Sequence, residues 1–228
     1  MQRIYDCSVD TDLLTGMRLA KVALGRKELV VLPTDTVYGL ACDAFSHEGV
    51  QKLLDAKGRD RQSPPPVLIG SSSALAGLAH EVPDLALKLA ETFWPGALTM
   101  ILKAQTSLTW DLGETKGTVA LRMPDHKIAL ALLKETGPLA VSSANLTGKE
   151  AAITCQQAEA YLGSKVSVYL DGGSSPKAEA STIIDMTDLV DSVNESGEIV
   201  TTGKARVVRR GALSVEKLAI VLGENLEV

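Results

Sequence analysis

The apolar positions of the chain switch repeatedly between helical and strand-like spacing. Between residues 11 and 25 they recur every three or four positions, which predicts an amphipathic helix. The next run, 28–32, is short, apolar and followed by Pro33, so it predicts a buried strand. A chain that repeats this alternation is typical of an α/β protein.

The same alternation continues to the end of the chain. Ser46 can cap a helix that Gly58 ends, and Thr154 with Gln157 resembles a capping box. The other predicted helices cover 83–93, 126–135 and the residues after Ser214. The other predicted strands are 66–69, 97–102, 118–121, 139–141, 166–170, 181–186 and 206–209. The polar stretch 185–204 predicts a surface excursion such as a β-hairpin.

Several of these strands follow one another without a helix of crossover length between them, which favours antiparallel pairing. With 228 residues, of which 45% are hydrophobic and 22% charged, the chain can bury a substantial core. We therefore expect a single α/β domain over residues 1–228, built on a twisted, mostly mixed or antiparallel β-sheet with flanking helices.

Composition limits the class of ligand. Only 4% of the residues are aromatic, so stacking platforms for single-stranded nucleic acid have little material. The net charge of -5 argues against a broad phosphate-binding face. Cationic residues that matter for function should therefore be concentrated in a local pocket.

The N-terminal residues contain no targeting signal, and the cysteines show no pattern of a metal site. No long apolar segment follows Met1, so we expect a cytoplasmic protein that does not enter the membrane. Cys7, Cys42 and Cys155 are widely separated, which does not suit a disulfide framework, and they have no zinc-ligand spacing to any histidine. We expect no metal held by the protein's own side chains.

Short polar clusters border the apolar runs at three places, namely Leu32 to Leu40, Lys57-Gly58-Arg59 and Ser142 to Asn145. An α/β protein displays a binding site at strand ends in this way. Neither a P-loop nor a dinucleotide-binding glycine motif is present, so any nucleotide needs another arrangement. The candidate phosphate donors are Lys57, Arg59, Arg61, Arg122, Ser142, Ser143, Asn145 and Arg209.

Seven sequence blocks, in order, resemble the YrdC/Sua5 family of L-threonylcarbamoyladenylate synthases. They are Pro33-Thr-Asp-Thr-Val-Tyr-Gly-Leu40, Ala56-Lys-Gly-Arg59, Phe93-Trp-Pro-Gly-Ala-Leu-Thr99, Val119-Ala-Leu-Arg-Met-Pro124, Val141-Ser-Ser-Ala-Asn-Leu-Thr-Gly148, Ser181-Thr-Ile-Ile-Asp185 and Arg209-Arg-Gly211. No single block is decisive, but their order over nearly the whole chain is specific. The resemblance implies the short, single-domain form, with a concave cationic cavity.

The resemblance also implies an activity. The enzyme would combine L-threonine, bicarbonate and ATP into threonylcarbamoyl-AMP and release pyrophosphate. A separate threonylcarbamoyl transferase complex would then modify tRNA to threonylcarbamoyladenosine (t6A), so contact with tRNA would be indirect. Mg²⁺ would be bound mainly through the ATP phosphates, which is usual for phosphoryl-type transfer.

Residue roles follow from the motif positions. The threonine site would contain Thr34, Thr36, Tyr38, Arg122, Val141 and Ser181, with Arg122 pairing the carboxylate. The ATP site would contain Lys57, Arg59, Ser63, Thr118, Ser143, Asn145 and Arg209. Lys57, Arg59 and Arg122 would be the catalytic residues, and Asp35 is a candidate for the base that takes the ammonium proton.

The chain departs from the family pattern at three places. Ser63 stands where many members have Asn or Lys, so Arg61 is a candidate for the missing cation. Ser142 replaces a Pro, and Arg209-Arg210 replaces Arg-Pro, so either arginine could face the site, of which we favour Arg209. Two other functions stay open: a double-stranded RNA-binding module, and a carbamoyl-transfer domain like those of hydrogenase-maturation proteins.

Overall fold

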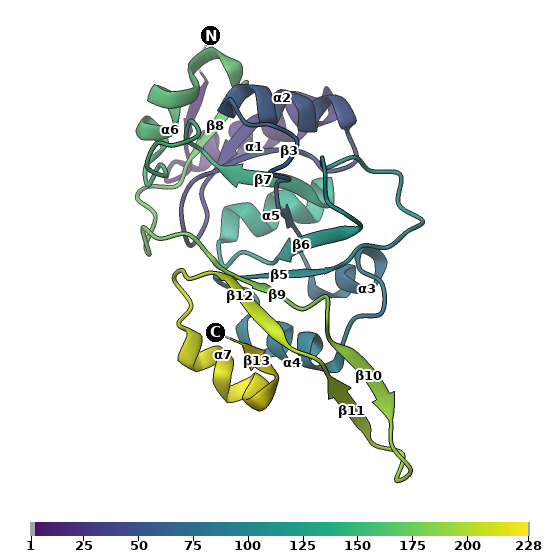
Figure 1. Ribbon diagram of the computed structural model, residues 1–228. Coiled ribbons are helices and arrows are strands. Elements are labelled where there is room, and N and C mark those ends of the chain that lie inside the picture. The colour runs from purple at the N-terminus through teal and green to yellow at the C-terminus, as the bar shows by residue number, and fades with distance from the viewer. Residues whose placement is uncertain (1–2, 228) are drawn as a thin grey trace.

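The computed structural model describes residues 3–227, which are built around an eleven-stranded sheet (Figure 1). The strands are β1 (Ile4–Asp6), β2 (Val30–Leu32), β3 (Gly39–Asp43), β4 (Val67–Leu68), β5 (Leu98–Lys103), β6 (Thr118–Arg122), β7 (Leu139–Ser143), β8 (Val168–Asp171), β9 (Thr182–Asp185), β10 (Val190–Val193), β11 (Ile199–Thr202), β12 (Ala205–Arg209) and β13 (Leu226–Glu227). The helices are α1 (Asp10–Gly25), α2 (His47–Lys57), α3 (Leu75–Leu78), α4 (Asp84–Phe93), α5 (Lys127–Thr136), α6 (Cys155–Leu162) and α7 (Val215–Leu222).

The sheet is mixed. Its strand order is β1-β8-β2-β3-β7-β4-β6-β5-β9-β12-β13. The pairs β1/β8, β2/β8, β4/β6, β5/β9 and β12/β13 are parallel, whereas β2/β3, β3/β7, β4/β7, β5/β6 and β9/β12 are antiparallel. The expected α/β fold with a mixed sheet and flanking helices is confirmed.

Alternation along β2 divides the core between the two faces of the sheet. Val30 and Leu32 pack into the cluster that contains residues of α1 and α5. Val31 points the other way, into the larger cluster that includes residues of α2, α4, α6 and α7. Successive strand residues face opposite sides of a sheet, so one apolar run supplies both layers.

The predicted helix boundaries agree closely with the structure. Ser46 Oγ accepts a hydrogen bond from the Gly49 N–H at 3.0 Å, and Gly58 ends α2 in the left-handed conformation with φ 64°. Thr154 caps α6 by accepting from the Gln157 N–H at 3.2 Å. The polar stretch after β9 forms the β10–β11 hairpin, which projects from the body of the molecule (Figure 1).

One central strand was not predicted. β3 contains Gly39 and small residues such as Ala41, and it begins three residues after Thr36, in the polar turn that follows β2. It is nevertheless paired on both edges, with β2 and with β7. This long-range pairing, rather than local propensity, makes the segment a strand.

No helix within residues 3–227 combines the length and the apolar character needed to cross a membrane.

Candidate active site

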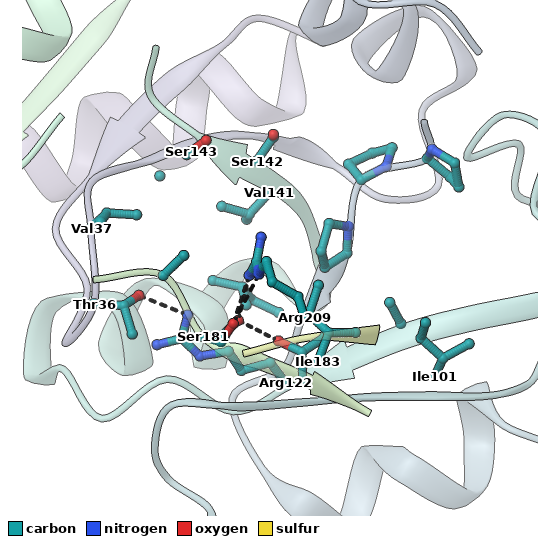
Figure 2. Close-up of a pocket in the computed structure, with 18 of the residues that line it drawn as sticks. Thr36, Val37, Ile101, Arg122, Val141, Ser142, Ser143, Ser181, Ile183 and Arg209 are labelled. Atoms are coloured by element: carbon teal, nitrogen blue, oxygen red, sulfur yellow. Dashed lines mark hydrogen bonds between the residues drawn. The ribbon is translucent and has the colours of Figure 1, made fainter. Parts of the chain in front are cut away.

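A cavity of about 310 Å³ lies in the middle of the sheet (Figure 2). Its walls come from β5, β6, β7, β9 and β12, together with the turn between β2 and β3 and the prolines 64–66. This size falls within the usual range for small-molecule sites, about 300–1,000 Å³. Segments far apart in the sequence therefore meet at one hollow.

The charged residues on the cavity wall are arginines. Arg59, Arg122 and Arg209 line it, and no Asp or Glu is among the described residues that do. Burial, followed by the charge of Arg59, lowers the pKa of the Arg209 guanidinium below its ordinary value of 12.5. An arginine nevertheless keeps its proton near neutral pH, so these side chains place positive charge where anions can approach.

Arg122 is fixed by three hydrogen bonds to two segments, the turn between β2 and β3 and the residues just before β5. Its Nε donates to the Gly96 carbonyl at 2.9 Å, its Nη1 donates to Thr36 Oγ1 at 2.9 Å, and its Nη2 donates to Asp35. Gly96 follows Trp94-Pro95, where Trp94 Nε1 donates to the Leu98 carbonyl at 2.7 Å. The Trp94-Pro95-Gly96 segment is therefore a packing corner that positions Arg122, because Trp94 itself is absent from the cavity wall of the described chain.

The turn after β2 orders its own polar side chains. Thr34 Oγ1 donates to the Val37 carbonyl at 2.7 Å and accepts from the Thr36 N–H at 3.2 Å. Thr34, Thr36 and Val37 all line the cavity. Short hydroxyl-to-backbone bonds of this kind fix a turn that is neither helix nor strand.

Asp35 belongs to the same turn, and both of its carboxylate oxygens accept hydrogen bonds. Oδ1 accepts from Arg122 and from the Asp125 N–H at 3.0 Å, while Oδ2 accepts from Lys177 Nζ at 3.3 Å. The side chain is only 5% exposed. This arrangement leaves Asp35 poorly placed to take a proton from a substrate.

Ser181 joins the start of β9 to β12. Its hydroxyl lies 2.8 Å from Thr99 Oγ1, and its carbonyl accepts from Arg209 Nε at 3.0 Å and from Nη2 at 2.8 Å (Figure 2). Arg209 rather than Arg210 therefore lines the cavity, which answers the question that the sequence left open.

Lys57 does not reach the wall. Its ammonium donates to the carbonyl of Asn145 at 2.7 Å and to the carbonyl of Ser143. Burial, followed by the charge of Arg59, lowers the pKa of Lys57 from 10.5 to about 8. The Asn145 amide is also turned away from the cavity and donates to the Lys149 carbonyl at 2.7 Å. These two side chains hold the segment that carries Ser142 and Ser143.

Of the remaining predicted site residues, four line the cavity and Ser63 does not. Thr118, Ser143 and Val141 line the cavity, as does Tyr38, whose hydroxyl points elsewhere and donates to the Gly173 carbonyl at 2.5 Å. Ser63 lies outside the described wall although the three prolines after it are part of it.

Two further candidates for phosphate donors, Arg61 and Ser142, have different surroundings. Arg61 forms an ion pair with Asp111 and is not among the described wall residues. Arg59 Nη1 donates to Ser142 Oγ at 3.3 Å, so this serine directs an arginine on the cavity wall.

Sequence reasoning did not single out several wall residues as ligands. They are Thr99, Ile101, Leu112, Thr115, Ala120, Ala151, Ala180, Ile183 and Val208, among others. Thr99 and Ile101 lie two residues apart on β5 and face the cavity, so Thr99 is a polar residue at a buried position of a strand whose residues 98–102 are otherwise apolar. That exception to the pattern was a usable signal, whereas the loop residues gave none.

Within residues 3–227 no group of three or more His, Cys, Asp or Glu side chains could hold a metal ion. The oxygen donors on the wall are neutral hydroxyls, such as those of Thr118 and Ser143. This set suits a cation that arrives with its own phosphate ligands and water, as Mg²⁺ does with a nucleotide.

A mixed sheet with an arginine- and hydroxyl-lined hollow is a site of the kind that suits small anionic ligands. The chain belongs to the Sua5/YciO/YrdC family, because the model of that family, described as telomere recombination, matches residues 22–208.

Named relatives and a solved structure agree with this membership. A putative threonylcarbamoyl-AMP synthase of Mycobacterium leprae is 44% identical over 98% of this chain and 95% of its own length. A threonylcarbamoyl-AMP synthase of Bacillus subtilis is 36% identical over 87% of this chain, which spans only 57% of that longer protein. Sua5 of Pyrococcus abyssi, solved in complex with L-threonine, is 30% identical, with a TM-score of 0.85 over 99% of this chain and 63% of its own.

Proposed function

We infer that this protein makes threonylcarbamoyl-AMP and pyrophosphate from L-threonine, bicarbonate and ATP. Relatives that carry the name threonylcarbamoyl-AMP synthase support the reaction, and the L-threonine complex of Pyrococcus abyssi Sua5 supports the amino acid substrate. The arrangement of Arg122 is the observation in this chain that carries the inference.

Arg122 is built to hold a carboxylate. Its three hydrogen bonds occupy three of five N–H groups, and within residues 3–227 the two that remain have no partner, one on each terminal nitrogen. A planar pair of N–H groups matches the two oxygens of a carboxylate. Thr36 Oγ1 accepts from Arg122, and Ser181 lines the same cavity, so the amino acid would be seated between these three side chains.

The nucleotide would occupy the rest of the cavity. Arg59 and Arg209 would meet its phosphates, and Thr118 and Ser143 would add neutral donors. Lys57 and Asn145 would not contact the nucleotide, but they would hold the backbone that positions Ser143. Mg²⁺ bound to ATP would neutralise part of the phosphate charge during the reaction.

The chemistry requires two anions to meet. Threonine and bicarbonate form a carbamate, with loss of water and a proton. A carbamate oxygen then attacks the α-phosphorus of ATP, the bond to the β-phosphate oxygen breaks, and pyrophosphate leaves. In water the two anions repel each other, whereas fixed arginines in a confined site offset the charge and hold the attack geometry. No protein nucleophile is needed.

The product would serve tRNA modification. A separate transferase complex would move the threonylcarbamoyl group to adenosine in tRNA and form t6A, so tRNA would meet this chain only indirectly. The reaction would take place in the cytoplasm, where ATP and tRNA are available.

A direct assay tests this function. Purified protein is incubated with MgATP, bicarbonate and labelled L-threonine, and the products are separated to detect a labelled adenylate. Omitting bicarbonate should abolish the adenylate. Pyrophosphate release that is equal with and without threonine would contradict the proposal.

A further inference from the structure

The buried carboxylate of Asp35 forms ion pairs with two cationic side chains, not one. Arg122 approaches one oxygen and Lys177 Nζ lies 3.3 Å from the other. Asp35 and Arg122 are 5% and 7% exposed, whereas the Lys177 side chain is 41% exposed. Lys177 therefore reaches into the protein from its surface.

The second cation changes the charge balance behind the cavity. An isolated pair of Asp35 and Arg122 would be neutral, and an entering carboxylate would compete with Asp35 for the guanidinium. With Lys177 in place, the group of three keeps one positive charge in excess. That excess matches the single negative charge of an amino acid carboxylate, and partial burial limits its screening by water.

Lys177 also belongs to the loop that leads into the site. This loop joins β8 to β9 and includes Ala180, which lines the cavity directly before Ser181. The Ser175 N–H donates to the Ile153 carbonyl at 2.8 Å, so the loop is tied down at a second point. The backbone is therefore anchored two residues before Lys177, whose side chain then reaches Asp35 through Nζ.

We propose that Lys177 is a positioning residue for the amino acid substrate. It balances Asp35 and thereby leaves the charge of Arg122 available to the substrate carboxylate. The inference rests on the proposed function, since it concerns the amino acid end of that site, but it assigns a role to a residue outside the cavity wall and outside the sequence blocks of the family.

Three variants test the role of the charge. Lys177→Met removes the charge and keeps much of the length, while Lys177→Arg keeps the charge. Lys21→Met is the matched control, because Lys21 also lies 3.3 Å from its carboxylate, Glu135, but in a pair that is 54% and 56% exposed. All three are assayed for threonine-dependent adenylate formation, with KM for threonine and for ATP measured separately.

Lys177→Met should raise KM for threonine about five- to tenfold and leave KM for ATP within about twofold, the range expected for losing a partner of a half-buried charge. Lys177→Arg should restore most of the wild-type value, and Lys21→Met should match wild type. A merely structural lysine would lower activity with both substrates alike or leave both unchanged, and either result would overturn the proposal.

The proposed function is judged by a different result. If the wild-type protein forms the adenylate and Lys177→Met has an unaltered KM for threonine, only the role of Lys177 is wrong. If the wild-type protein forms no threonine-dependent adenylate, the proposed function fails. Binding of L-threonine alone, measured by calorimetry on the wild type and on Lys177→Met, then still tests the charge argument.

Discussion

Arg122 and Asp35 form an ion pair inside the sheet, with side chains only 7% and 5% exposed. Burial lowers the pKa of the Arg122 guanidinium, and the Asp35 carboxylate opposes that shift. Removing one partner of such a pair leaves a charge buried without compensation. The pair should therefore matter for the stability of the fold as well as for the cavity.

Asp35→Asn should lower the free energy of unfolding by about 3 kcal/mol, because the buried guanidinium loses its counter-charge. Urea unfolding measures the change. Glu135→Gln removes one side of an exposed ion pair and should cost about 0.5 kcal/mol or less. Equal effects of the two substitutions would mean that the buried pair has no special weight.

Arg122→Lys keeps the positive charge but loses the planar fork. We expect KM for threonine to rise on the order of tenfold to a hundredfold, since a lysine cannot bind two carboxylate oxygens in parallel. KM for ATP should change much less. Steady-state kinetics with each substrate varied in turn separates the two, and a defect shared equally would contradict the assignment of Arg122 to the amino acid.

Arg209 and Arg210 provide a comparison between neighbours. Arg209 lines the cavity and donates to Ser181, whereas Arg210 does not line it. Arg209→Ala should raise KM for ATP about tenfold, within the usual strength of a charge-assisted hydrogen bond to phosphate. Arg210→Ala should stay close to wild type. The reverse order would place the wrong arginine in the site.

Lys57 gives a prediction about pH. Its pKa is about 8 in the folded protein, below the ordinary value of 10.5. Between these values the unfolded chain holds more protons than the folded one, so this lysine makes the free energy of unfolding rise with pH from about 8 to 10.5. The same contribution is lost as pH falls through about 8.

Lys57→Met has no titrating group at this position, so its free energy of unfolding should lack the rise with pH that Lys57 contributes. The free energy of unfolding of both proteins is measured by urea at several pH values from 7 to about 10, and the difference between them isolates Lys57. A difference that stays constant over this range would show that the lysine is not buried as a perturbed ammonium.

The sequence predicted the elements that have strong local signals. Ser46 and Gly58 mark the ends of α2, and the apolar runs mark most of the strands. β3 was missed, since its small residues have weak strand preference and become a strand through pairing on both edges. Local patterns cannot reveal such long-range pairing.

The same limit applies to the site. Motif order predicted one site for Arg59, Arg122 and Arg209, and in the structure these three arginines line one cavity. The sequence could not predict where these side chains point. Lys57 donates to backbone carbonyls at the end of β7, and Arg61 is held by Asp111, fifty positions away. Only the folded contacts decide which cations face the hollow.

In the proposed reaction one cavity joins the amino acid, bicarbonate and ATP. The most direct test is to supply ¹³C-bicarbonate with MgATP and L-threonine and to follow the adenylate by mass spectrometry while counting pyrophosphate. We predict one ¹³C atom per adenylate and one pyrophosphate for each adenylate formed, with neither product when threonine is omitted. An adenylate without ¹³C, or orthophosphate in place of pyrophosphate, would rule out this reaction.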